Sequence, residues 1–262
     1  MPSALPLAVA TKPYQLPLPM AVRSAAKCGA RGVQFDLRDE LVPQELTETG
    51  IRQLTHHLDE LTLRLAPAVF PLRRPLYAAA QMDARIAAVG DAIQFAGRLK
   101  TRVLTLRIGP LPSEKEAPLR RLLGDVLSDL VRLAERVGVT LGITTGPEPA
   151  LEYVHLVESI TTGRLGLDFD PCSCVAGGHS VAANFRELHK HIVHVQARDG
   201  VRDLVGQGTE VAVGSGVVNW LELLALFHEA DYRGWLTAIR TQGSNPGLDV
   251  TRAVQYLQEI YT

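Results

Sequence analysis

Short apolar segments alternate along the chain with longer segments in which apolar residues recur every three to four positions. The clearest example is 119–137, where the apolar residues form one helical stripe. Gly138 then supplies a left-handed stop, and Val139–Ile143 has the composition of a strand. The pattern predicts strands near Leu5–Ala10, Gly32–Asp36, Leu63–Val69, Arg102–Leu106, Val139–Ile143, Arg164–Phe169, Ile192–Ala197 and Gly234–Ile239.

Eight strands that alternate with helices favour parallel pairing, because each helix returns the chain to the same edge of the sheet. The length of 262 residues suits one barrel of eight such units. No glycine- or proline-rich linker divides the chain. The pattern therefore predicts a single α/β domain over residues 1–262, a (β/α)8 TIM barrel of parallel strands inside an outer ring of helices.

Three of the predicted strands alternate apolar residues with polar or small ones, although helices should cover the outside of a barrel. The simplest geometry turns the apolar set toward the helices and the other set into the barrel. Small residues alone could fill the narrow axis, but Asp168, His194 and Gln196 together favour a polar interior with a pocket at the carboxyl ends of the strands. The inward set comprises Thr140, Gly142, Thr144, Gly166, Asp168, Asp170, His194, Gln196 and Arg198.

The charge balance and the cysteines limit the classes of function. The chain has 27 basic and 28 acidic residues, a net charge of −1, so no general field favours nucleic acid or an acidic membrane as a partner. Three cysteines do not form a disulfide framework. The first 20 residues are broken by five prolines and lack a basic start, which is atypical of a signal peptide. We expect a cytoplasmic protein whose oligomeric state the sequence leaves open.

Six segments, in order along nearly the whole chain, resemble the xylose isomerase-like TIM barrels. This superfamily contains sugar phosphate isomerases and epimerases and also the endonuclease IV type of barrel. The resemblance implies the same fold and a site for a small carbohydrate-like ligand. The segments are Gly32–Asp36, Leu141–Glu148, Leu167–Pro171, His194–Asp199, Val211–Gly216 and Tyr232–Leu236.

The resemblance also implies a divalent metal held by a glutamate, an aspartate, a histidine and a second glutamate. Those positions correspond to Thr144, Asp170, Gln196 and Ile239, so only the aspartate remains. A shift of one residue at Ile239 still gives no carboxylate. The family glutamates also act as acid and base, and neither Thr144 nor Ile239 accepts a proton near neutral pH. A degraded metal site and no cofactor are therefore expected.

Five residues are candidates for binding a substrate. Arg107 and Arg198 end their strands and point to the carboxyl end by alternation, where they suit a carboxylate, a phosphate or an acidic sugar. The alternative is that these arginines do not bind a ligand and instead form structural ion pairs with Asp36, Asp170 or Asp199. Gln196 could form hydrogen bonds with a hydroxylated ligand, or it could be an amide satisfied inside the barrel. Arg38 lies on the same rim. For His194, a hydrogen bond to Asp168 in the core is favoured over contact with a ligand.

The residues after Phe169 allow two interpretations. Asp170 followed by Pro171 is a good start for a helix, which is compatible with a role in the pocket. Cys172 and Cys174 could offer thiolates to zinc beside Asp170, but a Cys-x-Cys pair is weak evidence and small cysteines pack readily into a turn.

Four functions remain open at this stage. The first is a sugar isomerase/epimerase-like barrel that binds a sugar, polyol or sugar acid with metal-dependent isomerisation lost or altered. The second is an active carbohydrate isomerase, epimerase or lyase whose metal site, for Mg, Mn or Zn, is rebuilt around Asp170 and Gln196. The third is an abasic-site endonuclease, which needs a metal cluster and a basic groove that the sequence does not display. The fourth is a partner-binding surface.

Overall fold

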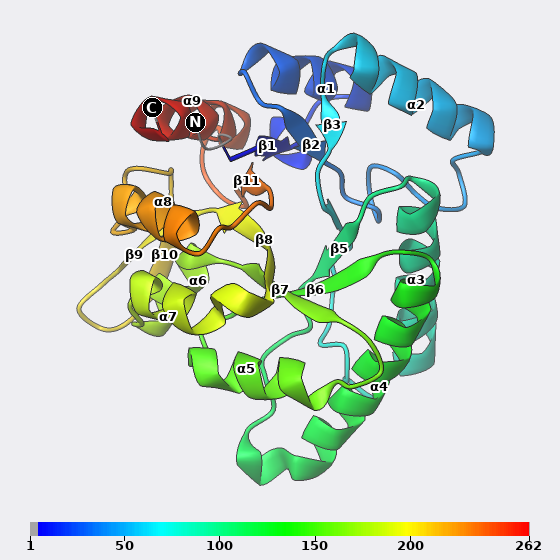
Figure 1. Cartoon of the computed structure of the whole chain (residues 1–262), viewed down its shortest axis with the longest axis vertical. Coiled ribbons are helices and arrows are strands. Elements are labelled where there is room, and N and C mark those ends of the chain that lie inside the picture. The colour runs from blue at the N-terminus through cyan, green and yellow to red at the C-terminus, as the bar shows by residue number, and fades with distance from the viewer. Residues whose placement is uncertain (1–4, 262) are drawn as a thin grey trace.

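The computed structural model describes residues 5–261, in which nine short parallel strands form one barrel-like sheet surrounded by helices (Figure 1). This confirms the predicted TIM barrel. The order of the strands in the sheet is β3-β2-β1-β11-β8-β7-β6-β5-β4. The strands are β1 (Leu7–Ala10), β2 (Gly32–Gln34), β3 (Arg64–Leu65), β4 (Ala68–Val69), β5 (Val103–Leu106), β6 (Thr140–Thr144), β7 (Leu165–Phe169), β8 (Ile192–Ala197) and β11 (Leu236–Ala238).

The barrel closes through the segment 64–70, which the sequence predicts as one strand. Its halves β3 and β4 are separated by Ala66 and Pro67, and proline has no N–H to donate to a ladder. The Ala66 N–H donates to the Val33 carbonyl at 2.9 Å and the Phe70 N–H to the Thr105 carbonyl at 2.9 Å. One segment thus joins both edges of the sheet.

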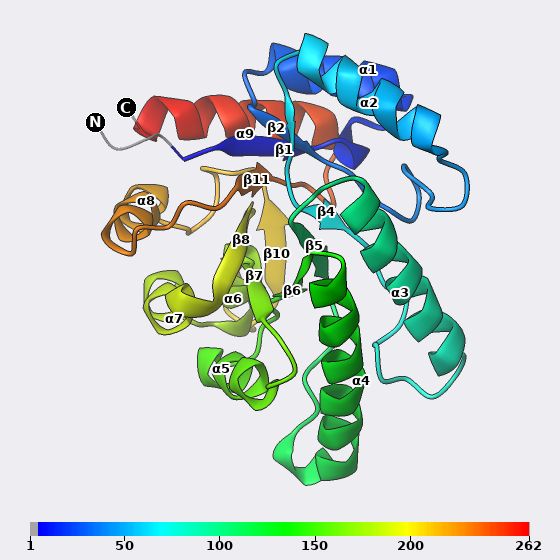
Figure 2. The same cartoon turned by 45° about the vertical axis from the view of Figure 1, so that its right-hand side comes forward.

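Helices cover the outside of the barrel. In Figure 2, α9 lies along β1 and covers the first strand. The helix predicted over 119–137 is α4, and its apolar stripe is buried as expected. The helices are α1 (Leu18–Lys27), α2 (Glu48–Glu60), α3 (Met82–Arg98), α4 (Ala117–Arg136), α5 (Ala150–Ser159), α6 (Pro171–Gly177), α7 (Val181–Leu188), α8 (Trp220–Glu229) and α9 (Pro246–Tyr261).

The two faces of the strands divide largely as the alternation predicts. Phe169 of β7 contacts Phe185 of α7 at a ring separation of 5.9 Å, so this apolar face lies against the helices. Val193 differs, because the pairing of β7 with β8 shifts register at this point. The side chain of Val193 lies against Gly142 and Gly166 inside the barrel. The expectation that Val193 faces the helices is therefore wrong, and a β-bulge is the reason.

A two-stranded antiparallel hairpin follows β8, formed by β9 (Asp199–Arg202) and β10 (Gly208–Val211), and the sequence does not predict it. Buried Asp199 fixes the loop after the hairpin. Its carboxylate accepts hydrogen bonds from the backbone N–H groups of Gly200, Gly214, Gly216 and Val218 at 2.8–3.2 Å, and from the indole of Trp220 at 3.1 Å.

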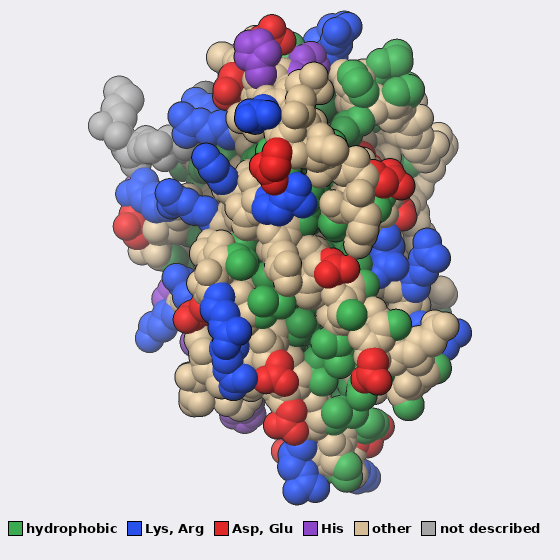
Figure 3. Space-filling view, turned by 90° about the vertical axis from the view of Figure 1, so that its right-hand side faces the viewer, with side chains coloured by type: hydrophobic (Ala, Val, Ile, Leu, Met, Phe, Trp, Pro, Cys, Tyr) green, Lys and Arg blue, Asp and Glu red, His purple; other side chains and the backbone are tan. Residues whose placement is uncertain are grey.

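Charged side chains of both signs are interspersed on the face shown in Figure 3. This agrees with the near-zero net charge of the chain. Within residues 5–261, no helix has the length and apolar character needed to cross a membrane.

Candidate functional site

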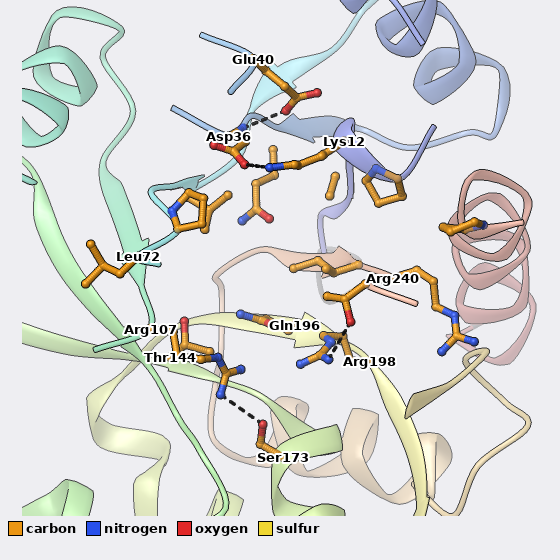
Figure 4. Close-up of a pocket in the computed structure, with 18 of the residues that line it drawn as sticks. Lys12, Asp36, Glu40, Leu72, Arg107, Thr144, Ser173, Gln196, Arg198 and Arg240 are labelled. Carbon is orange, nitrogen blue, oxygen red and sulfur yellow. Dashed lines mark hydrogen bonds and ion pairs between the residues drawn. The ribbon is translucent and has the colours of Figure 1, made fainter. Parts of the chain in front are cut away.

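A cavity of about 730 Å³ opens at the carboxyl ends of the strands, here called the mouth (Figure 4). Its lining comes from the residues that end, or directly follow, β1, β2, β4, β5, β6, β8 and β11. This is where the inward polar faces of a parallel barrel meet. The polar lining residues are Lys12, Gln15, Gln34, Asp36, Glu40, Arg107, Thr144, Ser173, Gln196, Arg198, Arg240 and Thr241.

Asp168 lies beneath the floor of this cavity and has no exposed surface. Its carboxylate accepts hydrogen bonds from the Thr144 hydroxyl at 2.7 Å and from the Gln196 amide. His194 Nδ1 bonds the same carboxylate at 2.7 Å, while Nε2 bonds Thr237 at 2.7 Å. The predicted bond between His194 and Asp168 is thus present. A buried carboxylate with four strands anchored to it, directly or through His194, fixes the floor of the mouth.

Asp170 ends β7 and is fully buried directly behind Arg107, Ser173 and Arg198, three residues that line the cavity. One carboxylate oxygen accepts hydrogen bonds from Arg107 Nη2 at 2.7 Å, from the Ser173 hydroxyl at 2.7 Å and from Arg198 Nη1. Burial disfavours the ionised form, but the charges of Arg198 and Arg107 outweigh it and hold the pKa of Asp170 below its usual range. Asp170 also caps α6 by accepting from the Ser173 N–H, which confirms the predicted helix start.

Glu210, on the hairpin strand β10, is a second buried carboxylate at the mouth. It accepts from Arg198 Nε at 2.9 Å and from the Thr241 N–H at 3.1 Å. Arg240 lies beside it and donates through Nε to Asp249 at 3.0 Å. Its Nη1 is buried without a hydrogen bond among residues 5–261, and the nearest oxygen of Glu210 is 3.8 Å away. Because this nitrogen has almost no exposed surface, a ligand in the cavity does not reach it, and Asp249 and Glu210 are the groups that hold the Arg240 guanidinium in place.

The opposite wall of the cavity carries Lys12, Asp36 and Glu40, as Figure 4 shows. The ammonium of Lys12 pairs with Asp36 and with Asp39. Burial opposes the charge of Lys12, but the bonds to Asp36 and Asp39 raise its pKa. Burial raises the pKa of Glu40, whose carboxylate accepts from the Asp36 N–H at 2.9 Å and from Thr11. Glu40 is thus a half-buried carboxyl in the cavity lining whose pKa lies above its usual range.

The donors around Asp170 do not fit a divalent metal ion. Two of the three donors on its Oδ2 are guanidinium nitrogens, which bring positive charge to the place where a cation would need negative charge. Residues 5–261 contain no group of three or more His, Cys, Asp and Glu side chains arranged to share an ion. Thr144 and Gln196 point at Asp168 instead, and Ile239 offers no donor atom.

The two cysteines of the Cys-x-Cys pair are buried in α6 and do not line the cavity. Burial raises the pKa of Cys172 to about 11 and that of Cys174 to about 12. Both thiols are thereby kept in the protonated form, which is a poor metal ligand. These buried surroundings are the ones expected of small cysteines that pack into a turn.

The structure brings most of the predicted site residues together at the mouth. Thr144, Gln196, Ile239, Arg107 and Arg198 line the cavity, and His194 lies one layer below it. Arg38 is absent from the lining. Its guanidinium stacks 4.4 Å from the ring centre of Phe70 and donates to the Pro71 carbonyl at 2.7 Å.

Four lining or adjacent residues were not predicted. Lys12 and Arg240 lie two residues beyond the ends of β1 and β11, so the rule that selected Arg107 would have found them if the strand ends had been placed to the residue. Glu40 lies further along, in the loop after β2, where alternation gives no signal. No comparable signal marks Glu210, because it reaches the mouth on the unpredicted hairpin.

A parallel barrel surrounded by helices, with a cavity at the carboxyl ends of its strands, defines a TIM barrel. Residues 22–260 match the model of the xylose isomerase-like TIM barrel family, and this chain belongs to that family. No protein of curated function matches the chain in sequence.

Solved structures share the fold at low sequence identity. A xylose isomerase domain protein from Planctomyces limnophilus is 20% identical, with a TM-score of 0.85 over 99% of this chain and 98% of that one. A D-tagatose 3-epimerase-like protein is 18% identical, with a TM-score of 0.81 over 98% and 97%. D-psicose 3-epimerase from Clostridium cellulolyticum H10, solved with D-tagatose, is 11% identical, with a TM-score of 0.78 over 98% and 99%. At these identities the likeness shows the fold alone.

Proposed function

We propose that this chain binds a small sugar, polyol or sugar acid at the mouth, with metal-dependent isomerisation lost or altered. The observation that carries the proposal is the pair of guanidinium groups on Asp170, the one carboxylate left at the metal-ligand positions that the family resemblance implies. The epimerase-like neighbours support a carbohydrate-like ligand. Within this class we favour a ligand with an acidic group.

Free donors at the mouth support the preference for an acidic ligand. Arg107 uses Nη2 on Asp170 and Nη1 on Ser173 and the Thr145 carbonyl, which leaves its Nε without a partner among residues 5–261. Arg240 also lines the cavity and adds a positive charge there. A guanidinium fork binds carboxylate and phosphate oxygens well, and the Gln196 amide suits a hydroxyl group.

Calorimetric titration with Mg²⁺, Mn²⁺ and Zn²⁺ tests the metal half of the proposal. We expect no stoichiometric binding in the micromolar range, because an ion would have to displace two arginines from Asp170. One ion bound per chain, lost in Asp170→Asn, would refute a degraded site and favour a metal site rebuilt around Asp170 and Gln196.

A panel of ligands tests the proposal that the mouth binds a carbohydrate-like ligand with an acidic group. Sugar acids and sugar phosphates should bind more tightly than neutral polyols of the same size. Arg107→Gln should weaken binding of the acidic ligand by about 10- to 100-fold, the value of a hydrogen bond to a charged group. Arg132→Gln, at an exposed ion pair with Asp129 on α4, is the matched control and should have no effect. Equal affinity for acidic and neutral ligands would contradict the preference.

A working isomerase, epimerase or lyase is the second candidate, and Glu40 favours it. Its carboxyl faces the cavity with a pKa raised by burial, which is the property of a general acid or base. Exchange of ligand protons with solvent deuterium, lost in Glu40→Gln, would support this activity. A ligand that binds without exchange would favour binding alone. Neither candidate involves nucleic acid, so we expect no nicking of abasic DNA.

A further inference from the structure

The opposite end of the barrel, where the strands begin, carries a basic residue at most strand starts. Each of these side chains is exposed and lies at the first residue of a strand or within three residues before it. The near-zero net charge of the whole chain hides this pattern. The residues are Arg31, Arg64, Arg102, Arg164, Lys190 and Arg233.

Four of these cations line a depression of about 600 Å³ at this end of the barrel, namely Arg102, Arg164, Lys190 and Arg233. They come from the starts of β5, β7, β8 and β11, which place them around the barrel axis. The depression shares no lining residue with the cavity at the mouth.

The inner wall of this depression includes Val103, Thr140 and Val193. Val193 reaches this position through the β-bulge in β8 and lies over Gly142 and Gly166, which have no side chain to compete for the space. The two valines form an apolar patch between the cations, and a concave surface with like charges along it concentrates their field.

The cations of the depression are largely unpaired. Within residues 5–261, Arg102, Arg164 and Lys190 make no ion pair, whereas Arg233 pairs with Asp231 at 2.5 Å. Asp231 is the one carboxylate in the lining.

One further carboxylate lies beside the depression, outside its lining: Glu135 accepts from the backbone N–H of Arg164 at 2.8 Å. His189, which is in the lining, bonds the Arg186 carbonyl at 2.8 Å. Four cations against Asp231 and Glu135 still leave a net positive charge that an anion would neutralise.

We propose that this depression binds a small, multiply charged phosphate-type anion. Three arginines offer planar forks that match phosphate oxygens, and the lysine adds a point charge. Four cations on separate strands suit a ligand whose charges are spread over several phosphate groups. The concave shape and limited volume suit a compact anion rather than a nucleic-acid duplex.

Titration with inorganic tripolyphosphate at low ionic strength tests this site. We expect saturable binding of one anion per chain, with amide chemical-shift changes at Thr140 and Val193. The variant R102Q/R164Q/K190Q should bind about tenfold more weakly or worse, from the summed loss of three exposed charge contacts. Added salt should weaken wild-type binding.

The matched control is R23Q/K115Q/R252Q, which removes three exposed cations from other parts of the surface. None of the three forms an ion pair within residues 5–261. It has the same net charge as the test variant and should bind within about twofold of wild type. Equal weakening in both variants would show a non-specific charge effect and overturn the proposal. Chemical-shift changes at Thr144 and Gln196 of the mouth, or no binding to the wild type, would also overturn it.

Discussion

Asp170 joins two arginines that line the cavity, Arg107 and Arg198, to the framework of the barrel. A buried carboxylate with two guanidinium partners is costly to disrupt from either side, because the group left behind keeps its charge in a poorly solvated place. The same pairs orient Arg107 and Arg198 toward the cavity. At this position one residue contributes to stability and to the shape of the site.

Asp170→Asn should lower the free energy of unfolding by about 3 kcal/mol near pH 7, the scale for breaking a buried ion pair. The folded pKa of Asp170 lies below its unfolded value of about 3.9, so its stabilisation is complete above that value. It is lost as the pH falls through the folded pKa. Urea unfolding across this acid range should show wild type and variant converging, and a constant difference would contradict the assignment.

Asp199 is a second buried carboxylate, and it stabilises the loop after the hairpin by accepting hydrogen bonds from backbone N–H groups. Asp199→Ala leaves four N–H groups and the Trp220 indole without their acceptor, which should cost about 3 kcal/mol or more. Hydrogen exchange should accelerate over residues 212–219. Asp203→Ala at the exposed hairpin tip removes two bonds to Val205 and Gln207 and is the control, with less than about 1 kcal/mol expected. Unchanged exchange in the first variant would refute the role of Asp199.

The strands of the barrel depend on small residues where the bulge of β8 turns a valine inward. A Cβ at Gly166 would lie 2.5 Å from Val193 Cγ1, closer than side-chain atoms approach. Thr140 and Gly142 occupy the same narrow axis. At Thr140, Gly142 and Gly166 the limited space along the axis explains why the residues are small. Asp168, His194 and Gln196 form the polar floor of the mouth above them.

Gly166→Ala should destabilise the fold by about 1–3 kcal/mol through overpacking. Val193→Ala in the same chain should restore most of that loss, and a double-mutant cycle in urea measures the coupling. Gly124→Ala is the control, since nothing lies within 4 Å of its Cβ position on α4, and it should stabilise by about 0.5–1 kcal/mol. Additive effects at Gly166 and Val193 would contradict their contact.

At the scale of the whole molecule, the barrel separates two polar ends. The mouth contains cations already paired with Asp170, Glu210, Asp36 and Asp39, whereas three of the four cations in the depression at the opposite end, all but Arg233, have no such partner among residues 5–261. The two proposed sites share no residue. Binding at one end can therefore be altered without touching the other.

Chelation should leave the stability of the whole barrel unchanged. Because the centre of the mouth is held by arginine–carboxylate pairs, we expect the same Tm with and without EDTA, and no rise with added Mn²⁺. Differential scanning calorimetry measures this. A Tm that falls in EDTA and recovers with one metal would count against the proposed loss of the site.

Much of the candidate site was predictable because it sits on regular strands. Alternation within β6, β7 and β8 placed Thr144, Asp168 and Gln196 inside the barrel, since side chains two residues apart share a face. Arg107 and Arg198 were predicted to reach the mouth, but which carboxylate they would pair with was left open. Glu210 and the register shift at Val193 had no local signal.

The sequence by itself determined the barrel, because helix and strand periodicities and the repeat of eight units are local properties of the chain. It also determined which strand faces are polar. Only the tertiary structure decided that Arg107 and Arg198 converge on Asp170, that a hairpin carries Glu210 into the mouth, and that four strand starts form a cationic depression. These features join residues far apart in the chain, and their pairing depends on the geometry of barrel closure rather than on any pattern along the chain.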